Sequence, residues 1–202
     1  AFAAILEDGS VVAWGDVNTG GDISGVSGLA NVVAIYSTAR AFAALTSSGA
    51  VVTWGNGLWG GDSSAETGNL AGGDLSSHVA QVYSSGSHFV ALKTDGSIVT
   101  WGYDLGGSYD FPSNLTNVVS VSSNSTSFAA ILDSGAVVTW GVSYLGGDSS
   151  VVSDQLDGTI DVTEIIATDS AFAAIKADGS VVTWGSEGGN STDVASALDG
   201  TN

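Results

Sequence analysis

The sequence of 202 residues has no cysteine, no methionine, one proline and only three basic residues, Arg40, Lys93 and Lys176. Without cysteine the chain can form no disulfide, thiol nucleophile or zinc–thiolate site. The 21 acidic residues give a formal net charge of −18, which opposes binding to nucleic acid or to an anionic membrane. No apolar run has transmembrane length, and no signal peptide is recognisable. We therefore expect no nucleic-acid partner and no membrane insertion.

Repetition dominates what the sequence does contain. A phrase of the type AFAAIKADGSVVTWG occurs five times, at Ala1–Gly15, Ala41–Gly55, His88–Gly102, Ser127–Gly141 and Ala171–Gly185. In each copy Asp-Gly-Ser or Ser-Gly-Ala separates an apolar segment from a β-branched segment that ends in Trp-Gly. Glycine supplies the positive φ that a tight turn requires, and Asp or Ser suits the position before it. Each copy is therefore predicted to form a β-hairpin.

The arms of these hairpins are nearly continuous apolar runs, without the alternation of a half-exposed sheet. Such runs predict sheets covered on both faces. Alanines beside one Phe and one Trp in every copy favour closely stacked sheets, as in propeller blades or solenoids. We expect the five repeat tryptophans to belong to the core: Trp14, Trp54, Trp101, Trp140 and Trp184.

The spacing of the copies defines the repeat. Their Phe residues recur every 39 to 47 residues, which is typical of one propeller blade. A third strand is predicted before four of the hairpins, at Val32–Ser37, Val79–Ser84, Val118–Ser123 and Val162–Ala167. We expect one repeat domain, 1–202, with the repeats 1–40, 41–87, 88–126, 127–170 and 171–202.

The first hairpin has no third strand before it. Either the fold closes without this strand, or a neighbouring chain supplies it, or the chain is a piece cut from something longer. The start in mid-phrase at Ala1, without an initiating methionine, favours a piece of a longer protein. An unpaired apolar edge invites strand addition from another molecule.

The phrase resembles the repeats of the regulator of chromosome condensation family, in which an apolar strand, Asp-Gly, a β-branched strand ending in Trp-Gly and a glycine-containing loop follow one another. The resemblance covers the whole chain and implies an all-β propeller-type tandem array with one sheet per repeat; an open β-repeat stack or solenoid is the alternative. The family is usually seven-bladed, whereas five repeats are present, and its usual His survives only as His88. The loops and basic patches of members that act on small GTPases or chromatin have no match here.

A glycine pair follows every Trp-Gly, and the residues around it are candidates for binding. Asp22, Asp62 and Asp148, which directly follow three of the pairs, offer oxygen ligands of the kind that Ca²⁺ prefers. They lack the dense Asp-x-Asp-x-Asp pattern of calcium loops, and turns that bond the local backbone explain them more simply. Aromatic residues of these loops are candidates for stacking on a glycan or a partner protein, with packing inside the loop as the alternative: Trp59, Tyr103, Tyr109 and Tyr144. Sequons for N-glycosylation begin at Asn114, Asn124 and Asn190.

No catalytic constellation is recognisable. His78 and His88 have no third ligand at metal spacing, and no Ser-His-Asp or paired-carboxylate pattern stands out. We expect a non-enzymatic structural or interaction module without a resident cofactor, part of a large extracellular or cell-surface protein and similar to the acidic arrays of marine microbial surface proteins. It would serve adhesion or build a filament by self-association. A glycan- or protein-binding propeller and an intracellular regulatory propeller are the alternatives.

Overall fold

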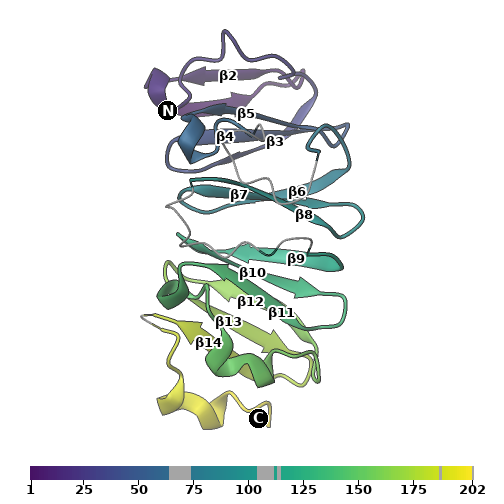
Figure 1. Cartoon of the computed structure of the whole chain (residues 1–202), viewed down its shortest axis with the longest axis vertical. Coiled ribbons are helices and arrows are strands. Elements are labelled where there is room, and N and C mark those ends of the chain that lie inside the picture. Colours follow the sequence, from purple (N-terminus) through teal and green to yellow (C-terminus); the bar gives the residue numbers. More distant parts are fainter. Residues whose placement is uncertain (64–73, 104–111, 113–114, 187, 202) are drawn as a thin grey trace. The chain divides into compact units, whose positions relative to one another are not determined.

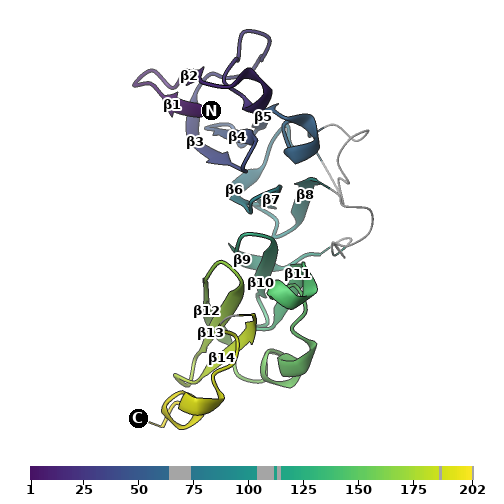
Figure 2. The same ribbon diagram turned by 90° about the vertical axis from the view of Figure 1, so that its left-hand side faces the viewer.

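The computed structural model describes residues 1–63, 74–103, 112, 115–186 and 188–201. The described chain contains fourteen β-strands and five short 3₁₀-helices, which confirms the predicted all-β class (Figures 1 and 2). It divides into two compact units, Ala1–Gly106 with Ser113–Leu115, and Gly107–Pro112 with Thr116–Asn202. No helix among the described residues is long and apolar enough to cross a membrane.

The first unit holds three sheets. A two-stranded sheet is followed by two three-stranded antiparallel sheets with the strand orders β3-β4-β5 and β6-β7-β8. The strands are β1 (Phe2–Ile5), β2 (Val11–Trp14), β3 (Val32–Ser37), β4 (Ala41–Thr46), β5 (Val51–Gly55), β6 (Val79–Ser84), β7 (His88–Lys93) and β8 (Ile98–Gly102), with the 3₁₀-helices η1 (Val17–Thr19) and η2 (Gly57–Trp59).

The second unit holds two sheets, each with three antiparallel strands in the same arrangement. Its elements are β9 (Val118–Ser123), β10 (Ser127–Leu132), β11 (Val137–Gly141), η3 (Ser143–Leu145), η4 (Ser150–Gln155), β12 (Val162–Ala167), β13 (Ala171–Lys176), β14 (Val181–Gly185) and η5 (Thr192–Ala197). All five predicted hairpins are present, and β3, β6, β9 and β12 have the bounds expected for the third strands. The propeller-type repeat array is thereby confirmed.

The hairpin turns have the predicted chemistry. In the first hairpin the Leu6 N–H donates to the Ser10 carbonyl at 2.8 Å and the Gly9 N–H donates to the Leu6 carbonyl at 2.9 Å, with Gly9 at φ +78°. The Asp8 carboxylate accepts from the Ser10 hydroxyl at 2.6 Å and from its N–H at 2.9 Å. These bonds favour the charged form and lower the pKa of Asp8. The turn is thus held together by hydrogen bonds among its own residues.

The loops after Trp-Gly begin with a 3₁₀-helix in three repeats, which the sequence analysis did not predict. The first glycine of each pair ends that helix in the left-handed conformation, with φ +97° at Gly20, +95° at Gly60 and +98° at Gly146. An L residue with a side chain rarely adopts this conformation, so the glycine pair marks the end of a helical turn.

Candidate interaction surface

The core of each unit consists of junctions, by which we mean the contacts between one sheet and the sheet before it. Within every hairpin the Phe ring stacks on the Trp ring, with centroids 5.1 Å apart for Phe42 and Trp54. This pair turns toward the preceding repeat. Phe89 and Trp101, for example, share a buried cluster with Ala43, Leu45 and Leu75.

A hydrogen bond fixes the geometry of each described junction. The indole Nε1–H donates to the carbonyl oxygen of the first glycine in the preceding repeat's pair, from Trp54 to Gly20 at 3.1 Å. Trp101 and Gly60 repeat this bond at 3.1 Å, and Trp184 and Gly146 at 3.0 Å. The equivalent glycine for Trp140, Gly106, lies outside the described residues.

These glycines are required for close approach as well as for their φ. A Cβ atom at Gly60 would stand 2.7 Å from the Phe89 ring, and one at Gly146 would stand 2.7 Å from the Phe172 ring. Because the glycine carries no side chain, the ring lies directly on the main chain and the indole reaches its carbonyl. A buried aromatic ring removes on the order of 150–250 Å² from water, so each junction stabilises the array by several kcal/mol.

The first repeat breaks this pattern. Phe2 and Trp14 stack at 5.6 Å like the other pairs, but they are 66% and 52% exposed. The expectation that Trp14 belongs to the core is wrong, because no sheet precedes β1 and β2 among the described residues. We call the side chains of Phe2, Ala4, Val12 and Trp14 the outer aromatic face. The only sequence signal for it is the missing third strand of the first hairpin.

The same hairpin also has an open edge. In the second repeat the Ala41 carbonyl accepts from the Thr38 N–H, so the backbone groups of alternate β4 residues point toward β3. The phrase places Ala3 and Ile5 at the positions of Ala43 and Leu45. The first sheet has two strands, and no third strand among the described residues covers the β1 edge.

The loop aromatics are partly used in packing. Trp59 stacks on Tyr103 with centroids 5.3 Å apart and an interplanar angle of 9°, and the Arg40 guanidinium lies 4.8 Å from the centre of the Trp59 ring. Packing within the loops, the alternative to ligand binding, is thus seen for Trp59 and Tyr103. Tyr144 is 73% exposed, whereas Tyr109 lies outside the described residues.

The Asp-Ser-Ser loops have a structural role. The Asp22 and Asp148 carboxylates each accept the N–H two residues later at 2.8 Å, and this bond lowers the pKa of both groups. Asp62 occupies the equivalent position in the second repeat. These aspartates belong to separate repeats, and the described residues bring no three acidic or histidine side chains together as a metal site. Ca²⁺ binding stays a prediction.

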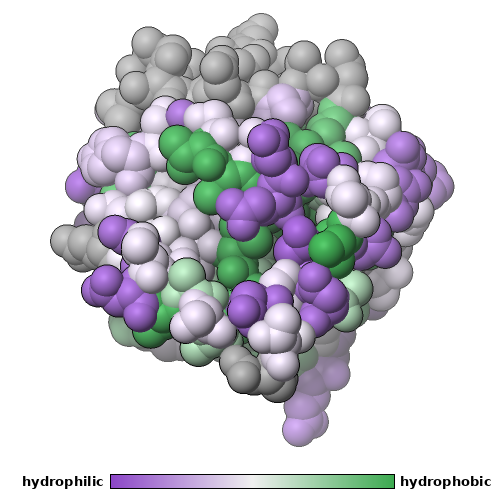
Figure 3. All heavy atoms as spheres, turned by 90° about the horizontal axis from the view of Figure 1, so that it is seen from below, coloured by the Kyte–Doolittle hydropathy of each residue, from purple (hydrophilic) through white to green (hydrophobic). Residues whose placement is uncertain are grey.

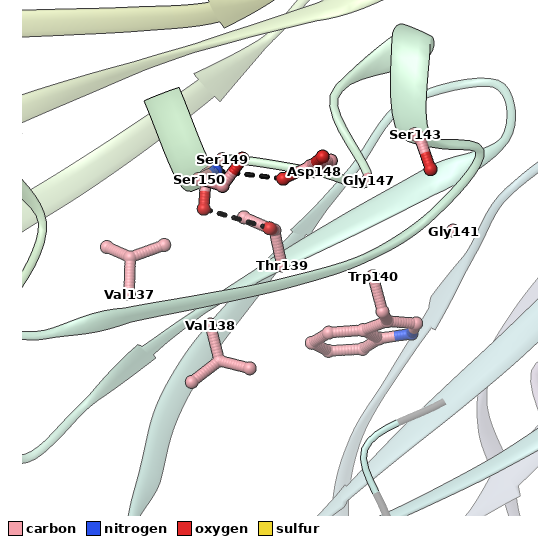
Figure 4. A pocket seen from close by; sticks show the side chains of 10 residues that line it. All are labelled: Val137, Val138, Thr139, Trp140, Gly141, Ser143, Gly147, Asp148, Ser149 and Ser150. Carbon is pink, nitrogen blue, oxygen red and sulfur yellow. Dashed lines mark hydrogen bonds between the residues drawn. The ribbon is translucent and has the colours of Figure 1, made fainter. Parts of the chain in front are cut away.

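A second bond holds the same loops to the sheet. The hydroxyl of the Thr that precedes Trp donates to the loop serine in three repeats, from Thr53 to Ser63 at 3.1 Å, from Thr139 to Ser149 at 3.0 Å and from Thr183 to Ser191 at 2.9 Å. In the fourth repeat this contact lies in a pocket of about 620 Å³ between β11 and its loop (Figure 4). The pocket contains one carboxylate, that of Asp148, and no cation, so it offers hydroxyl and amide groups and no acid–base pair.

The remaining candidates differ in their surroundings. Asn124 is buried and its amide nitrogen donates to the Leu145 carbonyl at 2.6 Å, so a glycan there would break an internal bond. Asn190 is exposed, and Asn114 lies outside the described residues. His88 is fully buried with Nδ1 2.8 Å from the Ser87 hydroxyl, as expected for a packed histidine.

The sequence matches no protein-family model and no curated protein. Solved structures match the fold at low identity. Yeast RCC1 (Prp20) bound to Kap60 gives a TM-score of 0.56 at 18% identity, over 90% of this chain and 53% of that one. The ectodomain of the Physcomitrella patens receptor kinase CR4 gives a TM-score of 0.52 at 18% identity, over 91% of this chain and 49% of that one. The CRINKLY WD40 ectodomain of the Arabidopsis thaliana receptor kinase ACR4 gives a TM-score of 0.52 at 15% identity, over 90% of this chain and 66% of that one.

The chain thus spans roughly half to two thirds of the length of these structures. At such low identity the likeness concerns the fold alone. The array of three-stranded sheets seen here is an RCC1-like propeller-type fold.

Proposed function

We propose that the chain is a non-enzymatic structural and interaction module that joins other chains through the open edge of β1. One observation carries this proposal: the first sheet has two strands where the four others have three. The backbone groups of Ala3 and Ile5 on that edge are the equivalents of groups that bind β3 in the second repeat. An apolar edge of this kind accepts an added strand from a partner.

The partner strand has a definable sequence. In the second repeat VVAIYS of β3 pairs with β4 in antiparallel register, Tyr36 opposite Ala43 and Ile35 opposite Ala44. The arm that would pair with it is nearly the same in the two repeats, AFAAI in the first and AFAAL in the second. A strand of the VVAIYS type, from another copy or another protein, therefore fits the β1 edge.

The setting that we propose is extracellular or at the cell surface, in adhesion or in a filament, as in the acidic arrays of marine microbial surface proteins. The repetition and the net charge of −18 support it. Antibody labelling of intact and permeabilised source cells tests the location: labelling only after permeabilisation contradicts it.

The edge is tested by the size distribution of the purified chain in light scattering, with and without a synthetic VVAIYS peptide. The peptide is expected to occupy the β1 edge and to reduce the mean mass. A peptide of the same composition in scrambled order is the control. If both peptides leave the assembly size unchanged, no donated strand holds the chains together.

A variant separates edge pairing from nonspecific peptide binding. Ala3→Pro removes an N–H on the open edge, which a donor strand needs, and proline is tolerated on a strand edge that faces solvent. The variant is expected to stay folded, to assemble less and to lose its response to the peptide. An Ala3→Pro chain that assembles and responds like the wild type contradicts the proposal.

A second candidate is a regulatory propeller that binds a basic protein inside the cell. The Prp20p structure is described with binding properties to Gsp1p and histones, and the charge of −18 would attract a basic partner such as a histone. A pull-down with histones in low and moderate salt tests it. If the histones stay bound in the presence of a competing acidic protein of equal charge, this candidate is supported. If the competitor releases them, it is excluded.

Glycan binding is a third candidate, favoured by the exposed ring of Tyr144. Tyr144→Ala is expected to abolish binding on a glycan array, whereas Leu58→Ala, at another exposed apolar residue of a loop helix, is the control. Binding that both variants retain removes this candidate.

A further inference from the structure

The sheets of this chain have fewer strands than is typical of propeller blades. A blade commonly contains four antiparallel strands, whereas four of the five sheets here contain three. After β11 the chain does not turn back as a fourth strand, but forms η3 and then η4. No strand among the described residues pairs with the free edge of β11, and the pocket of about 620 Å³ lies along this strand (Figure 4).

The main-chain groups of Thr139 point away from the sheet at this edge. The Val137 N–H donates to the Leu156 carbonyl in the loop at 2.9 Å, so Val137 directs its main chain outward. Alternate residues of an antiparallel strand direct their main-chain groups to the same side, so Thr139 also presents its N–H and C=O outward. No hydrogen bond from another described residue reaches these two groups. The pocket therefore contains one open main-chain donor and one open acceptor.

The loop closes the edge on either side of Thr139. At one end Val137 is bonded to Leu156, and at the other Gly147 packs on the main chain of Gly141, where a Cβ on Gly147 would stand 2.5 Å from the Gly141 carbonyl. The strand between Val137 and Gly141 is about 13 Å long, at roughly 3.3 Å per residue. This edge therefore has room for about three extended residues and not for a long strand.

Polar side chains lie on the Thr139 face of the strand. Figure 4 shows Thr139 turned toward the loop serines, with the ring of Trp140 on the other side of the strand. Asp148 is exposed, and its Oδ1 accepts from the Ser150 N–H at 2.8 Å. A carboxylate accepts several hydrogen bonds, so Asp148 can bind a cation as well. The pocket combines an open main-chain pair with one negative charge.

The equivalent edge of the last repeat differs. Its loop is two residues shorter, with SEGG at 186–189 where the fourth repeat has VSYLGG at 142–147. The Thr183 hydroxyl donates to the Gly189 carbonyl at 2.9 Å, so the loop backbone lies directly against the strand. Asn190 stands where the fourth repeat has Asp148. The longer, acidic loop thus distinguishes the β11 edge.

We propose that the β11 edge binds a short extended segment of a partner protein, with a lysine or arginine opposite Thr139. In an antiparallel pair two facing residues exchange both main-chain bonds, which the open N–H and C=O of Thr139 require. Facing residues also share one side of the sheet, so the basic side chain lies on the side of Asp148. The inference goes beyond the proposed joining through β1, and neither requires the other.

The charge of the chain favours a basic segment over a neutral or acidic one. The formal charge of −18 attracts cations, and the pocket itself holds no cation that would compete. On the face that Figure 3 shows, hydrophilic residues separate the apolar ones into small patches, so polar groups are available to a partner there. Because salt screens charge attraction, we expect the segment to bind more weakly as the NaCl concentration rises.

The test uses the blocked peptide acetyl-Val-Lys-Val-amide and follows the backbone amide signals by NMR. The peptide is expected to shift the amides of Thr139, Gly147 and Ser150. Two control peptides change one feature each: glutamate in place of lysine reverses the charge, and N-methylation of the lysine removes the N–H that donates to the Thr139 carbonyl. The N-methylated peptide is expected to bind about three- to tenfold more weakly, and the glutamate peptide more weakly still.

Variants of the chain test the same two contacts by calorimetry. Asp148→Asn is expected to weaken the lysine peptide about two- to fivefold and to reduce its salt dependence. Asp157→Asn is the matched control, because Asp157 is also an exposed turn aspartate, bonded to the Thr159 N–H at 2.8 Å, and does not line the pocket. Thr139→Pro removes the open N–H and is expected to abolish binding, whereas Thr139→Val keeps the N–H and the binding. Urea midpoints establish that both variants fold.

Three results overturn the inference. The first is the absence of amide shifts at Thr139 with the lysine peptide at millimolar concentration. The second is equal binding of the lysine, glutamate and N-methylated peptides, which needs no folded variant to interpret. The third is a shift of these amides by N-acetylglucosamine and not by the peptide, which makes the pocket a sugar site. Ala3→Pro is expected to bind the peptide like the wild type, so failure of this inference leaves the β1 proposal untouched.

Discussion

The first and second repeats contain versions of one phrase, AFAAILEDGSVVAWG and AFAALTSSGAVVTWG, yet their aromatic pairs have opposite environments. Phe2 and Trp14 lie mostly in solvent, whereas Phe42 and Trp54 are buried against the first repeat. Both pairs stack and both hairpins form. The hairpin is therefore encoded locally, while burial of its aromatic pair comes from the repeat before it. This is the nearest-neighbour energetics of a repeat protein.

A further difference between the two repeats lies in one pair of residues. The second repeat joins Thr53 to Ser63, where the first has Ala13 and Ile23. Ile23 packs at the junction with Phe42. Two apolar residues in the first repeat thus stand where the second repeat has a hydrogen-bonded pair.

The sharpest way to break the comparison is to remove the same side chain from both repeats. Trp54→Ala deletes a buried ring and its bond to Gly20, and it is expected to cost about 3–5 kcal/mol in the free energy of unfolding. Trp14→Ala deletes an exposed ring and is expected to cost less than about 1 kcal/mol. Urea denaturation of dilute protein measures both, and equal losses would mean that Trp14 is buried in solution.

The glycines of the junction provide the second test. Gly60 and Gly188 are equivalent and both have positive φ, but only Gly60 faces a Phe ring. Gly60→Ala is expected to combine the backbone penalty with overpacking and to cost roughly 2–4 kcal/mol. Gly188→Ala carries the backbone penalty alone, about 1–2 kcal/mol. A difference of zero between the two urea midpoints would refute the close approach of the Phe89 ring.

The threonine–serine bond is expected to have a smaller effect. Thr139→Val keeps the shape and removes the donor to Ser149, which is expected to cost about 0.5–1.5 kcal/mol. A double-mutant cycle with Ser149→Ala isolates the bond. Ala13→Val in the first repeat is the control, since no such bond exists there. Additive losses in the cycle would show that the bond contributes nothing.

The smallest expected effect is that of pH on the turns. The Ser97 hydroxyl and N–H hold the pKa of Asp95 below its ordinary value. A lowered pKa contributes stability above the ordinary value, and that contribution is lost as the pH falls through the lowered pKa. The Ser97 amide is expected to exchange its hydrogen faster below about pH 4 than above it, after correction for intrinsic rates. Asp95→Asn should remove this dependence, whereas the Ser48-Gly49-Ala50 turn, which has no carboxylate, should not show it.

Much of the fold could be predicted because each hairpin is specified within fifteen residues. Turn glycines, β-branched arms and spacing indicated all five hairpins and the four third strands. The location of Trp14 could not be predicted from its own phrase, because exposure depends on a neighbour that the phrase does not contain. The 3₁₀-helices were missed because segments of three to six residues are too short to show a helical period in the sequence. The sequon at Asn124 does not reveal that its amide is bonded inside the protein. The open edge of β1 could be predicted because the sequence contains five hairpins but only four third strands.

The indole of each described junction binds a main-chain carbonyl, and this has a consequence for the loops. A carbonyl is present whatever the side chains of a loop, and only the glycine that bears it must be kept. DVNT, NGLW and VSYL precede that glycine in three repeats, and they share no residue at any position. The scaffold thus separates what must be conserved for assembly from what is free to diversify, and new specificities can arise in these loops without loss of the array.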